Sequence, residues 1–110
     1  MHRVQGYSTT STATIAINTA ESTAIDLQGY AQAGFVLPAS FTGASVSFKV
    51  SADGTTYGAL YDSSNTLVSV TVTQARAYAF PIAVFPFRFV TILSASNETA
   101  ARSILIASKY

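Results

Sequence analysis

Apolar and polar residues alternate along most of the chain, most clearly in Ser45–Ala52 (SVSFKVSA), where three large apolar residues are separated by polar ones. A period of two is typical of a β-strand with one buried and one wet face. The Asp53-Gly54 dipeptide ends this pattern and favours a tight turn, because it accepts positive φ at low cost. We therefore expect Gly58–Tyr61 to return antiparallel to Ser45–Ala52 as a hairpin.

Short segments with this alternation recur at near-regular spacing, separated by turn residues. The expected strands are residues 12–17, 25–27, 30–37, 45–52, 58–61, 67–73, 77–82, 87–94 and 103–108. Only residues 73–78 could form a helical turn. The pattern predicts an all-β, single-domain antiparallel β-sandwich of about eight strands. We expect jelly-roll-like connections, with an immunoglobulin-like order as the alternative, because periodicity does not determine how strands are connected.

The N-terminal stretch Met1–Ser11 is polar and lacks the alternation. We expect residues 1–11 to form an extended arm or a disordered tail, and residues 12–110 to form the sandwich domain. The first residues have no apolar core of the kind found in secretory signals, so we expect the mature chain to begin near Met1. The longest apolar run, Ala77–Phe87, is short and interrupted by prolines, which argues against a membrane partner.

Charged residues are scarce, at 10% of the chain, while apolar residues make up 49%. An ordinary soluble domain has roughly 25% charged residues. Serine and threonine must cover most of the surface, and such a surface needs little desolvation of charge when a partner docks. We therefore expect the chain to pack against other subunits. The six basic residues are scattered, which argues against a nucleic-acid partner.

The chemical inventory predicts no enzyme. Cysteine is absent, and His2, the single histidine, lies in the predicted arm, where no nucleophile is held beside it. Four of the five carboxylates fall in predicted turns or strand ends, where they cap the backbone or aid solubility. Asp26, on a predicted strand, is expected to face solvent or pair with an arginine. The spacing of Asp53 and Asp62 matches no calcium loop, so we predict no catalytic, cofactor-binding or metal-binding residue.

The aromatic residues point to interfaces. Six tyrosines could stack sugars, but without tryptophan we favour packing at sheet edges and subunit contacts. Four phenylalanines crowd around two prolines between Phe80 and Phe89, more than one small core needs, and some are expected to reach a neighbouring subunit. The predicted interface residues are Arg3, Tyr7, Phe85, Phe87 and Tyr110.

Four segments carry a resemblance to known proteins: PASFTGASVSFKVSADGTTYGALYD, LVSVTVTQARAYAF, FRFVTILSAS and RSILIASKY. In this order they resemble small β-sandwich virion proteins of tailed bacteriophages. The resemblance covers most of Phe35–Tyr110. The residues that match its pattern are Leu37, Pro38, Phe41, Phe48, Ser51, Asp53, Gly54, Tyr57, Arg88 and Ser94.

This resemblance implies a non-enzymatic capsid decoration, cement or minor structural protein. It would be made in the cytoplasm of a bacterial host and located in the virion, on the capsid surface. There it would bind the major capsid protein and stabilise capsomer junctions, often as a homotrimer. The alternative is a tail- or fibre-associated module that binds a carbohydrate or receptor, because a fold does not determine a function.

Overall fold

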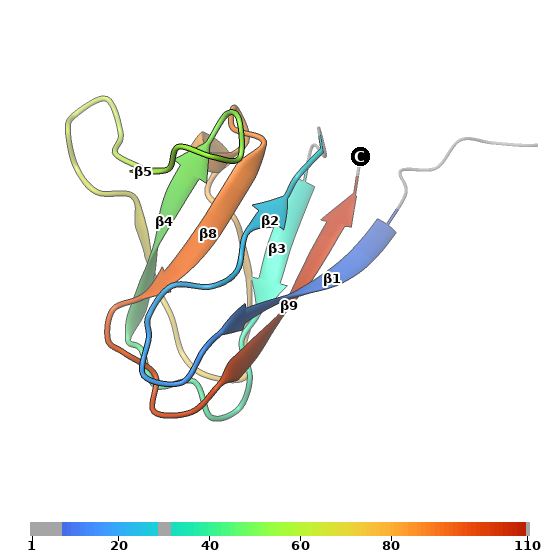
Figure 1. Cartoon of the computed structure of the whole chain (residues 1–110), viewed down its shortest axis with the longest axis vertical. Coiled ribbons are helices and arrows are strands. Elements are labelled where there is room, and N and C mark those ends of the chain that lie inside the picture. The colour runs from blue at the N-terminus through green and yellow to red at the C-terminus, as the bar shows by residue number, and fades with distance from the viewer. Residues whose placement is uncertain (1–7, 29–31, 110) are drawn as a thin grey trace, which may run out of the picture.

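The structure is a computed structural model that describes residues 8–28 and 32–109. Nine strands in this part of the chain form two antiparallel sheets that pack face to face (Figure 1), which confirms the predicted all-β sandwich. A 3-10 turn, η1 (Ile82–Val84), lies between the seventh and eighth strands. The strands are β1 (Ser8–Ile15), β2 (Ile25–Asp26), β3 (Gln32–Val36), β4 (Ser45–Ser51), β5 (Gly58–Ala59), β6 (Ser69–Thr71), β7 (Ala77–Ala79), β8 (Phe89–Ser94) and β9 (Arg102–Lys109).

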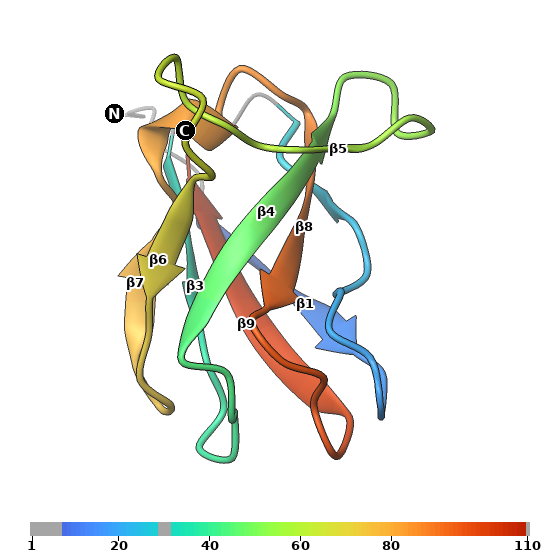
Figure 2. The same ribbon diagram turned by 90° about the vertical axis from the view of Figure 1, so that its left-hand side faces the viewer.

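The strand order follows a nested pattern. One sheet has the order β1-β9-β3-β7, and the other has the order β2-β8-β4, with β5 and β6 both paired to β4. Figure 2 shows β5 and β6 at opposite ends of β4. The first strand thus pairs with the last, the second with the one before it, and so on inward. This is the order of a jelly roll. An immunoglobulin sandwich instead places its first, second, fifth and fourth strands in one sheet, so the jelly-roll prediction is the correct one.

The strand register turns the alternating apolar residues inward. In β9 every second residue is buried, and in β4 Val46, Phe48 and Val50 face the core. Phe48 is completely buried. Its ring packs edge-on against Phe35 at 6.3 Å and against Phe80 at 5.6 Å between centroids. Aromatic rings from both sheets therefore fill the space between them.

Two features of the N-terminal region differ from the expectation. Strand β1 begins at Ser8, so the last four residues of the expected arm pair with β9. Ile17, expected on the first strand, lies in a turn and is 56% exposed. Asn18 causes this turn, because asparagine tolerates the left-handed backbone conformation that it adopts here, at φ 64°.

The predicted hairpin forms, with Lys49 opposite Ala59 and Val50 opposite Gly58. Its connection is longer than the expected tight turn and spans residues 52–57. Asp53 organises it by accepting hydrogen bonds from the N–H groups of Thr55 and Thr56. Gly54 has φ of +81°, where glycine carries no steric cost.

The helical turn occurs at residues 82–84 rather than at 73–78. Residues 77–79 are held in a strand by pairing with β3. Pro81 is the N-cap of this turn, and its carbonyl accepts the N–H of buried Val84 at 3.0 Å. Proline is tolerated at this flanking position because it has no N–H, and N–H groups at the start of a helical turn have no partner within that turn.

Candidate functional site

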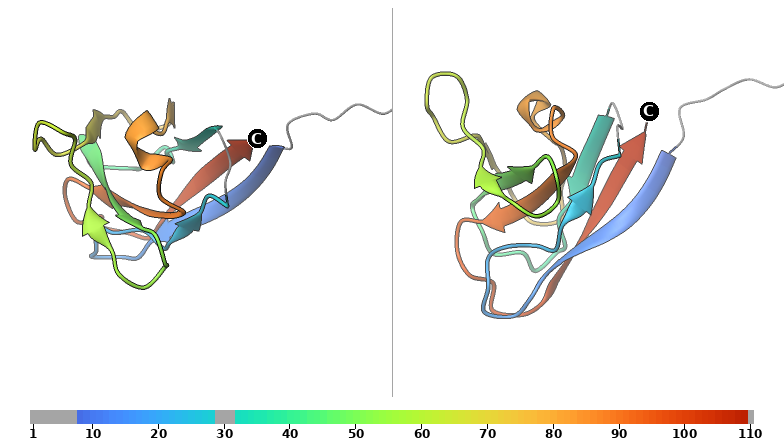
Figure 3. Two further views of the ribbon diagram at one scale, coloured as in Figure 1. Left: turned by 90° about the horizontal axis from the view of Figure 1, so that it is seen from above. Right: turned by 45° about the horizontal axis from the view of Figure 1, so that its top comes forward.

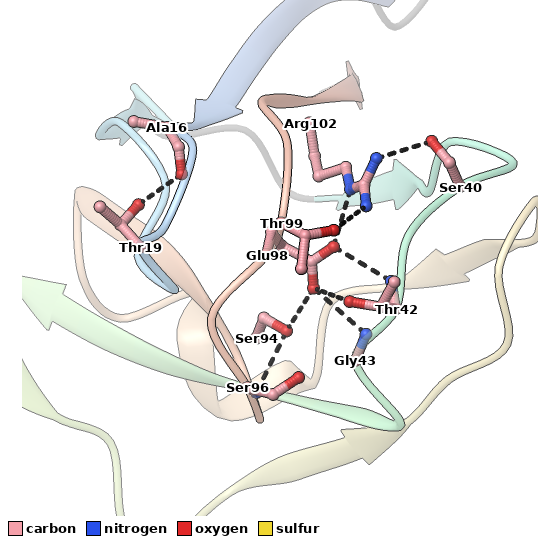
Figure 4. Close-up of polar contacts among 10 residues, drawn as sticks. All are labelled: Ala16, Thr19, Ser40, Thr42, Gly43, Ser94, Ser96, Glu98, Thr99 and Arg102. Atoms are coloured by element: carbon pink, nitrogen blue, oxygen red, sulfur yellow. Dashed lines mark hydrogen bonds and ion pairs between the residues drawn. The ribbon is translucent and has the colours of Figure 1, made fainter.

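The β8–β9 connection lies at the lower end of the sandwich in Figure 1, and a buried ion pair joins Glu98 of this connection to Arg102. Glu98, in the β8–β9 connection, is completely buried, and Arg102, the first residue of β9, is 8% exposed. Arg102 Nε donates to Glu98 Oε1 at 2.8 Å (Figure 4). We call these two residues the Glu98–Arg102 pair.

Donors from two other segments complete the bonding of the Glu98 carboxylate. The N–H and Oγ1 of Thr42 each donate at 3.0 Å, and the N–H of Gly43 donates at 3.2 Å. The hydroxyl of Ser94, at the end of β8, donates at 2.9 Å. Both carboxylate oxygens are therefore satisfied by the protein.

The backbone of Glu98 joins a third segment to this arrangement. Its carbonyl accepts the N–H of Asn18, and its N–H donates to the carbonyl of Thr19, both at 2.8 Å. Arg102 Nη1 in turn donates to Ser40 Oγ at 2.9 Å. The connections 16–24, 37–44 and 95–101 are thereby tied together, and they come from both sheets.

The electrostatics of Glu98 are those of a structural carboxylate. Burial alone would raise the pKa of Glu98, but hydrogen bonds from Arg102, Thr42 and Ser94 hold that pKa below its ordinary value. The group is ionised at neutral pH. Its oxygens are occupied by five donors, so it is not available to accept a proton from a substrate.

Sequence reasoning missed the Glu98–Arg102 pair. Glu98 does lie in a turn, as predicted, but it is buried and does not serve solubility. The signal that could have indicated this pair is the phase of β9, because Arg102 has the same inward phase as Ile104 and Ile106. A charge at an inward position requires a buried counterion.

Asp26 pairs with an arginine, as one of its two predicted alternatives states. Arg88 Nε and Nη2 each donate to one oxygen of Asp26 at 3.0 Å. This bidentate contact is the main cause that lowers the pKa of Asp26 and raises the pKa of Arg88. The Arg88 side chain is 57% exposed, so the pair contributes little to stability.

The remaining carboxylates also have structural partners. Glu21 accepts from Thr91 Oγ1 at 2.8 Å and lies 3.5 Å from Lys49 Nζ. Asp53 caps the β4–β5 connection, and the N–H groups of Thr55 and Thr56 lower its pKa. Asp62 accepts the N–H groups of two residues in its own turn, at 2.8 and 3.0 Å. The predicted capping role of Asp53 and Asp62 is thus confirmed.

Within residues 8–28 and 32–109, no three histidine, cysteine or acidic side chains lie close enough together to hold a metal ion. None of the helical segments in the same residues is long and apolar enough to cross a membrane.

A shallow hollow of about 420 Å³ lies on the outer face of the four-stranded sheet. Its floor is made of small residues because the register aligns Thr10, Ala107, Gly34 and Ala79 across the four strands. Among the described tyrosines, Tyr78 alone borders it.

The Tyr78 ring is engaged elsewhere. It stacks on Phe35, with 5.8 Å between centroids, and its hydroxyl accepts the N–H of Thr73 at 2.7 Å. The ring therefore does not present a face to a sugar in the hollow.

The predicted interface residues fall into two groups. Phe85 and Phe87 are half-buried beside η1 and pack against the core. Arg3, Tyr7 and Tyr110 lie outside the described residues. Contact of these five residues with a neighbouring subunit stays a prediction.

Comparison with known proteins gives one fold match. No protein-family model matches the chain, and no curated protein sequence is significantly similar to it. Among solved structures, the chain is similar to the SPBc2 prophage-derived protein YomS, with a TM-score of 0.66 and 14% sequence identity. The match covers 100% of this chain and 99% of YomS. The two proteins therefore share one fold over their whole described lengths.

Proposed function

We propose that this chain is a non-enzymatic structural protein of a bacteriophage virion, and that it binds the major capsid protein on the outside of the head. The observation that carries this proposal is the full-length fold match to a prophage-derived protein. The resemblance of Phe35–Tyr110 to phage β-sandwich virion proteins supports the same origin and adds the virion role.

The use of the acidic residues supports an architectural role. All five carboxylates of the sequence have an arginine, lysine, hydroxyl or backbone N–H partner. Among them, the Glu98–Arg102 pair ties three connections together and stiffens the lower end of the sandwich. A stiff body is what a protein needs in order to clamp two neighbouring capsomers.

The opposite end of the sandwich offers an apolar contact surface. Ile82, at the tip of η1, is 88% exposed, and Phe85 and Phe87 lie half-buried near it. Burial of apolar surface stabilises a contact by roughly 25 cal/mol per Å². Many copies, each with a small gain, would stabilise the whole shell. The homotrimer remains a prediction within this proposal, and it would match a local three-fold axis of the capsid.

Electron microscopy of phage particles from a host that carries this gene tests the proposal. We expect density of the size of this sandwich on the outer surface of the head. Density at the tail tip would contradict the proposal and favour the carbohydrate- or receptor-binding module. Absence from purified particles would contradict any virion role.

Two exposed isoleucines at opposite ends of the sandwich provide matched variants. Ile82→Asp should reduce head occupancy several-fold, because it places a charge in the proposed contact. Ile17→Asp, on the other end and 56% exposed, should leave occupancy unchanged. Occupancy is measured by gel densitometry of purified particles. Equal effects of the two variants would argue against the η1 end as the contact.

A further inference from the structure

Strand β1 forms an edge of the four-stranded sheet, and within the described residues the first half of this edge has none of the usual protections. The strand is eight residues long, pairs with β9 without a bulge, and contains neither a charged residue nor a proline. Proteins commonly protect sheet edges with charges, prolines, bulges or very short strands, because a bare edge pairs readily with another strand.

The backbone groups that face outward from this edge can be identified. Thr14 donates its N–H to Thr23 Oγ1 and accepts the Thr23 N–H at its carbonyl, both at 3.0 Å, so its backbone points away from β9. Antiparallel pairing alternates along a strand, so Ser8, Thr10 and Thr12 point the same way. Within the described residues, no bond is formed to Thr10 or Thr12 on this side.

The first half of β1 also projects beyond the sandwich. Residues 9–12 are all exposed, whereas Ala13 and Ile15 are completely buried. The difference arises because β2, the nearest strand of the other sheet, has only two residues and does not extend over the start of β1. Figure 3 shows β1 and β9 extending past the other sheet. Residues 8–12 therefore form an uncharged window at this edge, and residues 9–12 of the window are exposed.

We propose that this window binds the same window of a second copy of the chain, as an antiparallel pair of β1 strands. One register places all three outward-facing residues in hydrogen-bonded pairs. In it, Thr10 lies opposite Thr10 of the second copy, and Ser8 lies opposite Thr12. A shift by two residues in one direction would bring in Thr14, whose backbone is already bonded to Thr23.

The chemistry of the window favours a second copy as the occupant. A two-fold axis beside Thr10 brings identical serine and threonine residues together, and such cross-strand pairs are favourable. No charge lies in the window to oppose its own copy. The two four-stranded sheets become one continuous sheet, with both hollows on the same outer face. This two-fold pairing is an alternative to the homotrimer predicted above, and it does not depend on the rest of the proposed function.

Light scattering and amide hydrogen exchange on the full chain test this pairing over a range of concentrations. We expect a mass of twice the 11.5 kDa of one chain at high concentration. The amides of Thr10 and Thr12 should become protected as the dimer forms. The Thr14 amide, bonded to Thr23 within one chain, should be equally protected at every concentration.

Thr10→Pro removes one outward N–H and should weaken association at least tenfold. Proline is tolerated on an edge strand where its missing N–H faces solvent, so the melting temperature should be retained. Thr10→Val keeps the N–H and should dimerise as the natural chain does. If Thr10→Pro lowers the melting temperature, Thr10→Lys is the test variant instead. It should also weaken association, because it places two like charges opposite each other at the two-fold axis.

Four outcomes would overturn the inference. A trimeric mass would show association through another surface, because two-fold pairing of β1 strands leaves no free β1 edge for a third copy. A monomer with exposed Thr10 and Thr12 amides at every concentration would show that the edge stays bare. Protection independent of concentration would show that the chain covers its own edge. A folded Thr10→Pro variant that still dimerises would show that this edge is not used.

Discussion

The Glu98 carboxylate is held by five donors inside the protein, and it is the ion pair partner of a guanidinium that is also buried. A change at this residue therefore acts twice. It removes acceptors from Thr42, Gly43 and Ser94, and it leaves the charge of Arg102 without its counterion. Removing one member of a buried ion pair is far more destabilising than removing one member of an exposed pair.

Glu98→Gln should lower the free energy of unfolding by about 3–5 kcal/mol, because the Arg102 charge stays buried and uncompensated. Urea unfolding followed by circular dichroism measures this change. Glu21→Gln is the matched control, since Glu21 pairs with Lys49 at a side-chain exposure of 41% and should contribute less than about 1 kcal/mol. A similar loss of unfolding free energy in both variants would show that the buried Glu98–Arg102 pair stabilises the protein no more than an exposed pair does.

The pH dependence of stability follows from the lowered pKa of Glu98. Its ordinary value is 4.5, and the folded value lies below it. The stabilisation is therefore fully present above the ordinary value and is lost as the pH falls through the folded pKa. The stability gap between the natural chain and Glu98→Gln should narrow in acid. A gap that is constant from neutral to acidic pH would contradict this assignment.

The partners of Glu98 could not be predicted from the sequence, although the inward phase of Arg102 was visible in it. Thr42 lies 56 residues before Glu98, and no local pattern connects the two. Glu98 itself lies in a connection without periodicity, so nothing in its neighbourhood distinguishes it from a solvated turn residue. Its role depends on how the connections meet in space.

At the scale of strands and turns, rows of large apolar residues predicted β3, β4, β8 and β9 well, because burial on one face requires the alternation. Shorter elements were less predictable. Asn65 and Ala75 adopt φ near +60°, and the alanine gives no local sign of doing so. The choice between jelly-roll and immunoglobulin order depends on pairings such as β1 with β9, which local patterns do not encode.

A glycine in the β3–β4 connection provides a test at this scale. A Cβ at Gly43 would collide with the Ser94 hydroxyl and disturb its bond to Glu98. Gly43→Ala should therefore destabilise the protein by about 1–3 kcal/mol, the usual cost of overpacking. Thermal melting followed by circular dichroism measures the change.

Gly58, in β5, is the control glycine. A Cβ there meets no atom within 4 Å, so Gly58→Ala should be neutral or slightly stabilising. A Gly43→Ala variant as stable as Gly58→Ala would show that the β3–β4 connection adjusts without cost.

At the scale of the whole molecule, the start of β1 at Ser8 determines how much of the N-terminus can be deleted without loss of stability. Deletion of residues 1–7 leaves every described strand intact and should keep the melting temperature, while it reduces head occupancy if the N-terminal arm binds a neighbour. Deletion of residues 1–11 also removes four residue pairs between β1 and β9 and should lower the melting temperature. Thermal melting and gel densitometry separate the two effects. Equal melting temperatures would mean that the first half of β1 contributes nothing to stability.

The position of β9 has a consequence for how the chain is made. This strand, residues 102–109, lies between β1 and β3 in the middle of its sheet, yet it is synthesised after all the other described strands. Until it leaves the ribosome, β1 and β3 have no strand between them, and the apolar faces of the earlier strands stay uncovered. Pairings between distant segments also slow folding. The sandwich is therefore expected to complete its folding only after β9 has left the ribosome, and to need protection from aggregation until then.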